Sequence, residues 1–376
     1  MNNPFLQRAV PGVQELKPYQ PGKPIAELER EYGVSDIVKL ASNENPLGPG
    51  AKALQVINGA LPELARYPDG NGFDLKMALS NRHGVDPACI TLGNGSNDVL
   101  VLLAEAFLQE DLEAVYSQFS FAVYMLAVKA TGAIARVAPA RQSSAEQPLG
   151  HDLDAMFSSI TDKTRLVFIA NPNNPTGTWL TADQLGSFLD RVPPDVIVVV
   201  DEAYSEYVSL ADYPDCVAWL ERYPNLVVTR TFSKVFGLAG IRVGYSVSSP
   251  EIADVLNRIR QPFNVNSLAL EAAIAALEDE DHVQRSVSLN EQERSRISAE
   301  CERLGLHSIP SAGNFILVDM GQPALPIFDA LLHRAVIVRP VDNYGLPNYL
   351  RITVGTHDEN TRLIEALEHV LEPADA

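Results

Sequence analysis

The sequence predicts an α/β protein in which helices cover both faces of a mainly parallel β-sheet, followed by a smaller α+β unit. The first observation is a series of short apolar runs of strand length, with helical stretches such as 182–191 between several of them. Strands that alternate with helices are typical of parallel sheets. The second observation is a change after about residue 265, where two long helical stretches (268–283 and 288–305) precede three short strands and a last helix. The strand candidates are residues 134–137, 166–170, 196–200, 226–230 and 243–248 in the first part, and 315–319, 336–340 and 349–355 in the second.

The length of the chain agrees with two folded units. It has 376 residues, whereas one typical domain has about 100–200. The first 50 residues are rich in proline and glycine and contain one short helix candidate at 25–33. We expect an N-terminal arm (residues 1–45) that joins the small domain, a large domain (46–265) and a small C-terminal domain (266–376).

The composition argues against several classes of protein. The chain has 29 Lys and Arg against 48 Asp and Glu, a net charge of −19, which argues against nucleic acid and anionic membranes as partners. No apolar run reaches the roughly 18 residues of a membrane helix, and the N-terminus lacks the pattern of a secretory signal. The three cysteines are far apart and the seven histidines are scattered. We therefore expect a cytoplasmic protein without a disulfide framework or a metal site.

Polar motifs follow three successive strand candidates at the point where each strand ends. NPNNPTG follows the run LVFIA, DEAY follows VIVVV, and TFSK follows LVVTR. Because ligands of open α/β sheets bind beyond the carboxyl ends of the strands, we expect Asn174, Asp201, Tyr204 and Lys234 to lie together. A fourth motif, GNGSND (93–98), opens a helix, where small residues let backbone N–H groups approach an anion.

These residue types form one recognisable kind of site. Lys234 follows an apolar strand rather than lying on a charged helix face, so burial can make its amine a nucleophile toward a carbonyl. Asp201 follows five β-branched residues, and a carboxylate at a buried strand end needs a cationic partner such as a protonated pyridine nitrogen. Arg242, Thr231 and Ser233 can form a phosphate cradle with the GNGSND turn. An amine that captures an aldehyde, a pyridinium partner and a phosphate cradle describe a pyridoxal phosphate site.

The ordered motifs NPNNPTG, DEAY and TFSKVFGLAGIRVGY resemble those of fold-type I, aspartate aminotransferase-like enzymes, over nearly the whole chain. Within that superfamily the chain is similar to the histidinol-phosphate aminotransferases in the stretches KPYQPGKP, KLASNENPLGP, RYPDG, GNGSND, VIVRP and LRITVG. The resemblance implies a seven-stranded, mainly parallel sheet in the large domain, the cofactor pyridoxal 5′-phosphate, and a homodimer with active sites at the subunit interface. It also implies transfer of an amino group between L-histidinol phosphate and 2-oxoglutarate, giving imidazole acetol phosphate and L-glutamate, in L-histidine biosynthesis.

The resemblance assigns roles to individual residues. Lys234 matches the lysine that binds the cofactor covalently and moves the proton in catalysis, and Asp201 matches the acid that pairs with the pyridine nitrogen. Tyr204 and Asn174 match contacts of the ring hydroxyl oxygen. The matches to the phosphate contacts are Ser96, Asn97, Thr231, Ser233 and Arg242, the match to the ring-stacking aromatic is Phe121 with Phe119 as the competing choice, and the match to a contact with the neighbouring subunit's cofactor phosphate is Tyr67.

Other segments supply the residues expected to select the substrate. Arg351 in LRITVG matches the superfamily arginine that binds an α-carboxylate. Histidinol phosphate has no carboxylate, so the resemblance implies that Arg351 and Arg339 hold its phosphate. Two guanidinium groups suit a dianionic phosphate and can also bind a carboxylate of glutamate. Tyr19 and Asn43, in the N-terminal arm expected to fold over the site, are further candidates.

Alternative interpretations stay open beside these assignments. Rival activities are an aminotransferase of aromatic or other amino acids, with Arg351 on a carboxylate, and a pyridoxal phosphate decarboxylase of a phosphorylated amino acid. A cofactor-binding regulator is less favoured because such proteins generally carry a DNA-binding module, and no basic N-terminal extension is present. Purely structural interpretations are a surface lysine for Lys234, a helix cap for Asp201, ion pairs for Arg339 and Arg351, core packing for Phe121 and a turn for Tyr67.

Overall fold

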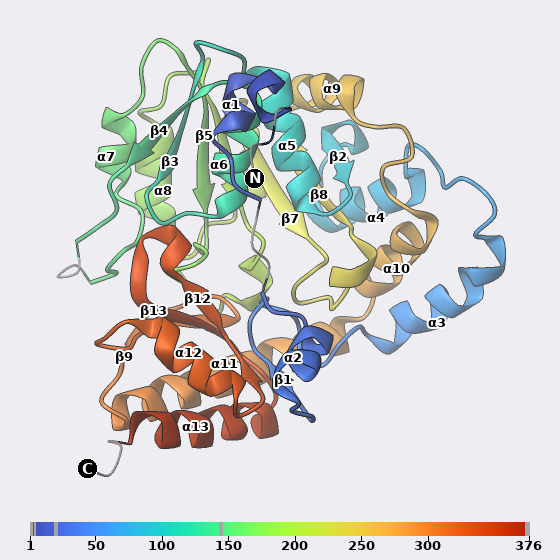
Figure 1. Ribbon diagram of the computed structural model, residues 1–376. Helices are drawn as coiled ribbons and strands as arrows, with labels where there is room; N and C mark the ends of the chain where they lie inside the picture. The colour runs from blue at the N-terminus through green and yellow to red at the C-terminus, as the bar shows by residue number, and fades with distance from the viewer. Residues whose placement is uncertain (1–2, 4, 19–21, 143–145, 373–376) are drawn as a thin grey trace.

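The computed structural model describes residue 3 and residues 5–18, 22–142 and 146–372. Figure 1 shows an upper body built around a large sheet and a lower body that holds the C-terminal part of the chain. The N-terminal arm starts on the upper body with α1 (Pro11–Gln14), which contacts α6 (Ala122–Ala130), and reaches the lower body with α2 (Ile25–Tyr32) and β1 (Val38–Lys39). The helix predicted at 25–33 is confirmed. Within the described residues, no helix is long and apolar enough to cross a membrane.

The upper body contains a seven-stranded sheet with the strand order β2-β8-β7-β6-β5-β3-β4. The pairs from β7 to β4 are parallel, whereas β8 is antiparallel to both of its neighbours. The sheet is therefore mainly parallel, as predicted. Its strands are β2 (Ile90–Gly93), β3 (Glu113–Ser117), β4 (Ile134–Ala138), β5 (Thr164–Ala170), β6 (Ile197–Asp201), β7 (Leu226–Thr231) and β8 (Gly244–Ser248).

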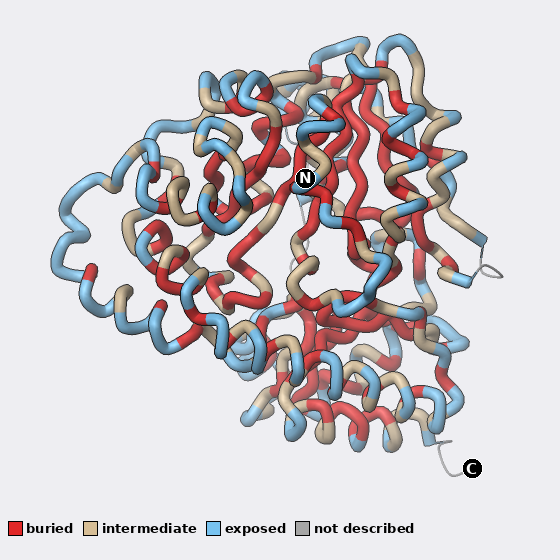
Figure 2. Tube along the Cα trace, turned by 180° about the vertical axis from the view of Figure 1, so that it is seen from behind, coloured by how far each residue is buried: buried red, intermediate tan, exposed pale blue. Residues whose placement is uncertain are grey.

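Helices cover both faces of this sheet, and the central strands are buried between them (Figure 2). Successive residues of β6 point to opposite faces, so Val198 and Val200 belong to one hydrophobic core and Ile197 and Val199 to the other. This arrangement explains why the strand is an uninterrupted apolar run. One core includes α3 (Ala51–Ala60), α4 (Phe73–His83), α7 (Leu153–Ser158), α8 (Ala182–Leu189) and α10 (Ser267–Leu277), and the other includes α5 (Ser96–Phe107), α6 and α9 (Pro250–Ile259).

The lower body is an α+β unit around a four-stranded antiparallel sheet with the order β12-β13-β10-β9. The N-terminal arm joins this body because β1 pairs in parallel with β11 (Val336–Ile337). Its elements are α11 (Glu280–Arg303), β9 (His307–Ile309), β10 (Phe315–Asp319), α12 (Ala324–Leu332), β12 (Arg339–Val341), β13 (Leu346–Thr353) and α13 (His357–Leu371). Short 3₁₀ turns join elements of both bodies at Leu6–Arg8, Leu61–Glu63, Pro87–Cys89, Ser205–Tyr207, Val217–Trp219, Ala239–Ile241 and Asp342–Tyr344.

The junction between the two bodies differs from the sequence prediction in one respect. The helix expected to continue to residue 283 ends at Leu277, and α11 begins at Glu280. The buried alanines of α10 lie in a core of the large sheet, together with Ala53 of α3. The domain division at 265/266 stays a prediction, and we propose that the large domain extends to the end of α10.

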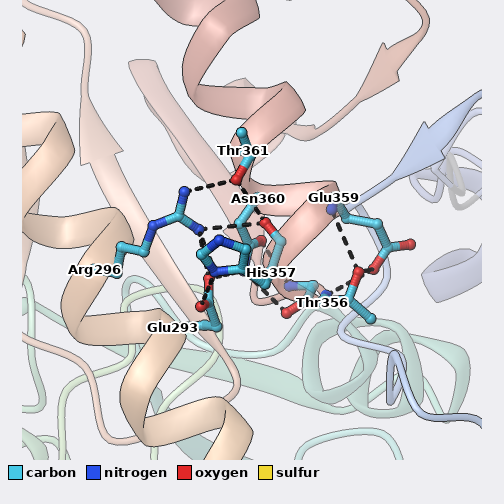
Figure 3. A network of polar contacts seen from close by, with 8 residues as sticks. Glu293, Arg296, Thr356, His357, Glu359, Asn360 and Thr361 are labelled. Atoms are coloured by element: carbon cyan, nitrogen blue, oxygen red, sulfur yellow. Dashed lines mark hydrogen bonds and ion pairs between the residues drawn. The ribbon is translucent and has the colours of Figure 1, made fainter.

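A polar network anchors the helix that follows β13 (Figure 3). The buried carboxylate of Glu293 on α11 accepts hydrogen bonds from Arg296 and Asn360, at 2.9 Å each, and lies 2.9 Å from Nδ1 of His357. Arg296 also donates to Oγ1 of Thr361 at 2.7 Å. Three of these residues lie at the start of α13, so the network fixes α13 against α11 directly after the strand that carries Arg351.

Candidate active site

The carboxyl ends of β5, β6 and β7 border a cavity of about 300 Å³ that small-domain strands border on another side. The three motifs predicted to meet at this sheet edge do meet here. Almost all of the predicted site residues line the cavity. They are Asn43, Ser96, Asn97, Phe121, Asn174, Asp201, Tyr204, Thr231, Ser233, Lys234, Arg242, Arg339 and Arg351.

Lys234 lies in the turn after β7, and its Nζ donates a hydrogen bond to the backbone carbonyl of Ser42 at 3.2 Å. The pKa of this amine is lowered from 10.5 to about 7, chiefly by burial and in part by the positive charges of Arg351 and Arg242, while Glu44 opposes the decrease. A large fraction of the amine is therefore neutral at neutral pH. A neutral amine can attack a carbonyl and accept a proton, which an ordinary surface lysine does poorly.

Asp201 ends β6 and is buried. Its carboxylate accepts hydrogen bonds from the hydroxyl of Tyr124 at 2.9 Å and from Oγ1 of Thr229 at 3.1 Å. Burial raises the pKa of Asp201, and these two hydrogen bonds oppose the rise. The negative charge of a buried carboxylate that accepts hydrogen bonds only from neutral groups is stabilised further by a cationic partner. The protonated ring nitrogen of pyridoxal phosphate would supply it, so the acid fits the cofactor.

The opposite part of the cavity is shaped for an anion. Ser96 and Asn97 begin α5, where free backbone N–H groups and the helix dipole favour negative charge. Arg242 donates from Nη1 to Oγ of Ser233 at 3.1 Å. A Cβ at Gly95 would lie 2.1 Å from Nη2 of Arg242, so the guanidinium can lie against this turn only because the residue is glycine. These groups fit the phosphate of pyridoxal phosphate.

Three segments distant in the sequence are joined at the centre of the site. The Tyr204 hydroxyl accepts hydrogen bonds from Nδ2 of Asn43 at 2.9 Å and of Asn174 at 3.3 Å. Arg351 donates to Oδ1 of Asn174 at 2.6 Å and to the carbonyl of Ala41 at 2.7 Å. The end of the N-terminal arm, the loop after β5 and the small-domain strand β13 therefore hold one another in place.

The two arginines predicted to bind substrate are direct cross-strand neighbours. Arg339 on β12 is the register partner of Arg351 on β13, and both are buried and line the cavity. Side chains at such a position lie on the same face of the sheet. Their separation of twelve residues in the sequence thus becomes adjacency in the fold, which makes a two-guanidinium anion site possible.

The structure distinguishes between the two phenylalanine candidates. Phe121 lines the cavity and packs edge-on against Tyr124, with ring centroids 5.9 Å apart. Phe119 is buried in a separate cluster with Ile309 and Leu317. Phe121 is therefore the aromatic placed to stack on a ring in the cavity.

Among the described residues, one predicted site residue, Tyr67, does not line this cavity. Tyr67 is 84% exposed and stacks on Phe263, with ring centroids 4.8 Å apart. It makes no contribution to the cavity of its own chain, which is compatible with its predicted role toward a neighbouring subunit. Tyr19 lies outside the described residues.

Sequence reasoning missed three residues of the site. Tyr124 on α6 holds Asp201, and it lies three positions after the predicted Phe121, which is the N-cap residue of that helix. The other two, Glu44 and Tyr344, line the cavity itself. Glu44 adjoins the predicted Asn43, so its position could have been inferred, whereas Tyr344 lies in a turn that only the fold brings to the site.

A buried amine with a lowered pKa, a buried acid and an anion cradle at the ends of parallel strands define a pyridoxal-phosphate-dependent enzyme of fold type I. The family aminotransferase class I and II matches residues 35–367. The chain therefore belongs to this family and is a pyridoxal-phosphate-dependent aminotransferase.

Individual relatives are similar over the whole chain. Histidinol-phosphate aminotransferase 2 of Pseudomonas fluorescens is 58% identical over 100% of both chains. Histidinol-phosphate aminotransferase 2 of Methylococcus capsulatus is 56% identical over 97% of this chain and 98% of its own. The crystal structure of histidinol-phosphate aminotransferase from Sinorhizobium meliloti in complex with pyridoxal-5′-phosphate has a TM-score of 0.88 at 30% identity, with 97% of each chain covered.

Proposed function

We propose that this aminotransferase transfers the amino group of L-histidinol phosphate to 2-oxoglutarate, giving imidazole acetol phosphate and L-glutamate, as a step of L-histidine biosynthesis. The observation that carries the proposal is the pair Arg339 and Arg351, adjacent across two strands and facing the cavity that contains Lys234. Two guanidinium groups match the dianionic phosphate of the amino donor, and a carboxylate of the oxo acid can take the same place. The whole-chain similarity to enzymes named histidinol-phosphate aminotransferase supports this substrate.

The side chains of the site have distinct tasks in this reaction. Bound pyridoxal phosphate supplies an aldehyde that captures the substrate amine and a ring that withdraws electrons from the reacting carbon. Asp201 holds the proton on the ring nitrogen, and Tyr124 and Thr229 keep its carboxylate oriented. Lys234 would hold the cofactor covalently, and its neutral amine would serve as the base that accepts the proton from the substrate carbon.

The remaining groups position the reactants. Tyr204 and Asn174, which are hydrogen-bonded to each other, would orient the edge of the ring, and Phe121, which lines the cavity, would stack on it. Ser96, Asn97, Thr231, Ser233 and Arg242 hold the cofactor phosphate. Arg351 links the substrate pocket to Asn174, so the substrate phosphate and the cofactor are held in one connected frame.

We further propose that the enzyme is a cytoplasmic homodimer. The segment from α3 to the start of α4 projects from the large domain (Figure 1) and carries apolar side chains that are 44–64% exposed at Leu54, Leu61, Leu64 and Phe73. Such a patch favours burial against a second subunit. Tyr67 lies in the same segment, where it could reach the cofactor phosphate of that subunit. Cys89, Cys216 and Cys301 are free thiols, as expected in a reducing compartment.

A half-reaction tests the proposed substrate. Histidinol phosphate is added to the purified holoenzyme without an oxo acid, and the visible absorbance of the bound cofactor is followed. We expect the absorbance to disappear with one equivalent of imidazole acetol phosphate formed, and to return when 2-oxoglutarate is added, because the two substrates react in turn.

Controls separate this activity from the rival ones. Lys234→Ala should abolish turnover, since the nucleophile and proton carrier is lost. Turnover of phenylalanine without turnover of histidinol phosphate would contradict the proposal and favour an aromatic aminotransferase. Release of carbon dioxide from a phosphorylated amino acid would favour a decarboxylase.

A further inference from the structure

Glu44 places a carboxylate on the wall of a cavity that binds anions. The cavity has to accept a cofactor phosphate, a substrate phosphate and the two carboxylates of an oxo acid, all anions. A carboxylate on its wall would repel them unless it has a partner of opposite character. Its ionisable lining nevertheless includes two carboxylates, at Asp201 and Glu44, beside the cations of Lys234, Arg242, Arg339 and Arg351. Asp201 is already assigned to the ring nitrogen. Glu44 remains, and its cationic partner, Lys39, does not itself line the cavity.

The backbone around Glu44 is fixed on both sides. Before it, the carbonyl of Ala41 accepts a hydrogen bond from Arg351 and the carbonyl of Ser42 accepts one from Lys234. After it, Nδ2 of Asn45 donates to the carbonyl of Val235 at 2.7 Å and to Oγ of Ser286 at 2.9 Å. The carboxylate of Glu44 is thus carried by a segment that is tied to the catalytic turn and to the substrate-binding strand.

The carboxylate itself stays open to a ligand. Its side chain is 47% exposed, and both of its oxygens accept hydrogen bonds from Nζ of Lys39, at 2.9 Å each. Each carboxylate oxygen can accept a further hydrogen bond. Glu44 lines the same cavity as Lys234, and Lys234 donates its hydrogen bond to the carbonyl of Ser42, two residues before Glu44.

We infer that Glu44 is a specificity-determining residue that accepts a hydrogen bond from the ring N–H of an imidazole-bearing amino donor. The inference rests on the proposed function and extends it to the other end of the substrate. Arg339 and Arg351 recognise the phosphate, and Glu44 recognises the heteroaromatic ring, whose N–H is a donor in the neutral form and whose protonated form carries a positive charge. The oxo acid has no such group, so it gains nothing from Glu44.

Two possible roles of Glu44 predict different effects of its removal on kcat/KM for the two substrates. If it acted only by modulating the charge of Lys234, its removal would affect both half-reactions, because Lys234 serves both. If it recognises the ring, its removal affects the amino donor alone. In an enzyme whose substrates react in turn, kcat/KM is obtained separately for each substrate.

The test compares Glu44→Gln with the unaltered enzyme. We expect kcat/KM for histidinol phosphate to fall about tenfold or more, as for loss of a charge-assisted hydrogen bond, and kcat/KM for 2-oxoglutarate to stay within about twofold. Enzyme loaded with pyridoxamine phosphate cannot transaminate an amine, so it gives the dissociation constant of histidinol phosphate without reaction. That constant should rise by a similar factor in the variant.

Glu31→Gln is the matched control. Glu31 is paired with Lys23, is 51% exposed and does not line the cavity, so its substitution removes the same charge from a comparable ion pair and should leave both substrates unaffected. An equal loss for both substrates, or no loss for histidinol phosphate, would overturn the inference while the proposed function stands. Failure of the unaltered enzyme to use histidinol phosphate would overturn both.

Discussion

At the scale of single residues, the protonation of Lys234 follows from its surroundings and predicts a pH dependence. Burial and neighbouring arginines lower the pKa of the amine to about 7, so the neutral fraction increases as the pH rises through that value. We expect the rate at which cofactor-free enzyme captures pyridoxal phosphate to rise between roughly pH 6 and 8 and then to level off. Stopped-flow absorbance measures this rate. A rate that keeps rising toward the pKa of free lysine would show that the amine is not desolvated.

A second prediction concerns Tyr124, which connects two parts of the cofactor site. Its hydroxyl donates to Asp201, and its ring stacks on Phe168 with centroids 4.9 Å apart. Tyr124→Phe keeps the ring and removes the hydrogen bond to the carboxylate, so we expect cofactor affinity to fall about tenfold. Titration of the cofactor-free enzyme with pyridoxal phosphate measures it. Tyr116→Phe, at a buried tyrosine of the same core, is the control and should bind as the unaltered enzyme does.

At the scale of elements, the Glu293 network predicts how the small domain depends on pH. Burial raises the pKa of Glu293, but hydrogen bonds from Asn360, His357 and Arg296 outweigh it, and the pKa lies below the usual 4.5. A carboxyl whose pKa is lower in the folded state stabilises the fold at neutral pH, and this stabilisation is lost as the pH falls through the folded-state pKa.

Glu293→Gln should therefore lower the free energy of unfolding by about 2–4 kcal/mol at neutral pH, because it removes a buried carboxylate and leaves Arg296 without its partner. The difference should shrink in acid, where the carboxylate of the unaltered protein is protonated as well. Denaturant titrations of both proteins at neutral and at acid pH measure this difference in the free energy of unfolding. Glu291→Gln, on the exposed side of the same helix, should change stability by less than about 0.5 kcal/mol. Equal effects of the two substitutions would contradict the role of the network.

The elements also show which features can be read from the sequence. The runs that became β5, β6 and β7 are long, apolar and followed by polar motifs, so both the strands and the site residues at their ends were predictable. The strands β2 and β9 have only four and three residues, so no apolar run of strand length marks them, although the GNGSND motif follows β2. The break between α10 and α11 contains neither glycine nor proline, although the acidic residues Glu280 and Asp281 favour a helix start there.

Contacts between elements were less accessible to sequence reasoning. Arg339 and Arg351 were predicted by resemblance, but their adjacency depends on the register of β12 and β13. Tyr124 reaches Asp201 from a helix 77 residues away in the chain. Local propensity and periodicity determine neither of these two contacts. The first depends on strand register and the second on how a helix packs on the sheet.

At the scale of the whole molecule, the projecting segment around α3 predicts the state of assembly. Leu64 is 55% exposed in this segment, in the same patch as Leu61 and Phe73. Because more than half of Leu64 is exposed, Leu64→Asp should leave the fold intact but place a charge in the proposed interface. We expect the dimer dissociation constant to rise at least about tenfold. Sedimentation equilibrium measures this constant, and circular dichroism checks the fold.

The control for assembly uses an equally exposed leucine elsewhere. Leu325 on α12 is 50% exposed and belongs to the small domain, so Leu325→Asp should not alter the dimer. If Tyr67 reaches the cofactor phosphate of the neighbouring subunit, the Leu64→Asp monomer should also bind pyridoxal phosphate less tightly, although no residue of its own cavity has changed. Assembly and cofactor binding would then weaken together at the same protein concentrations. A Leu64→Asp protein that remains dimeric would contradict the proposed position of the interface. A monomer that binds the cofactor with unaltered affinity would separate Tyr67 from the active site and show that each cavity is complete within one chain.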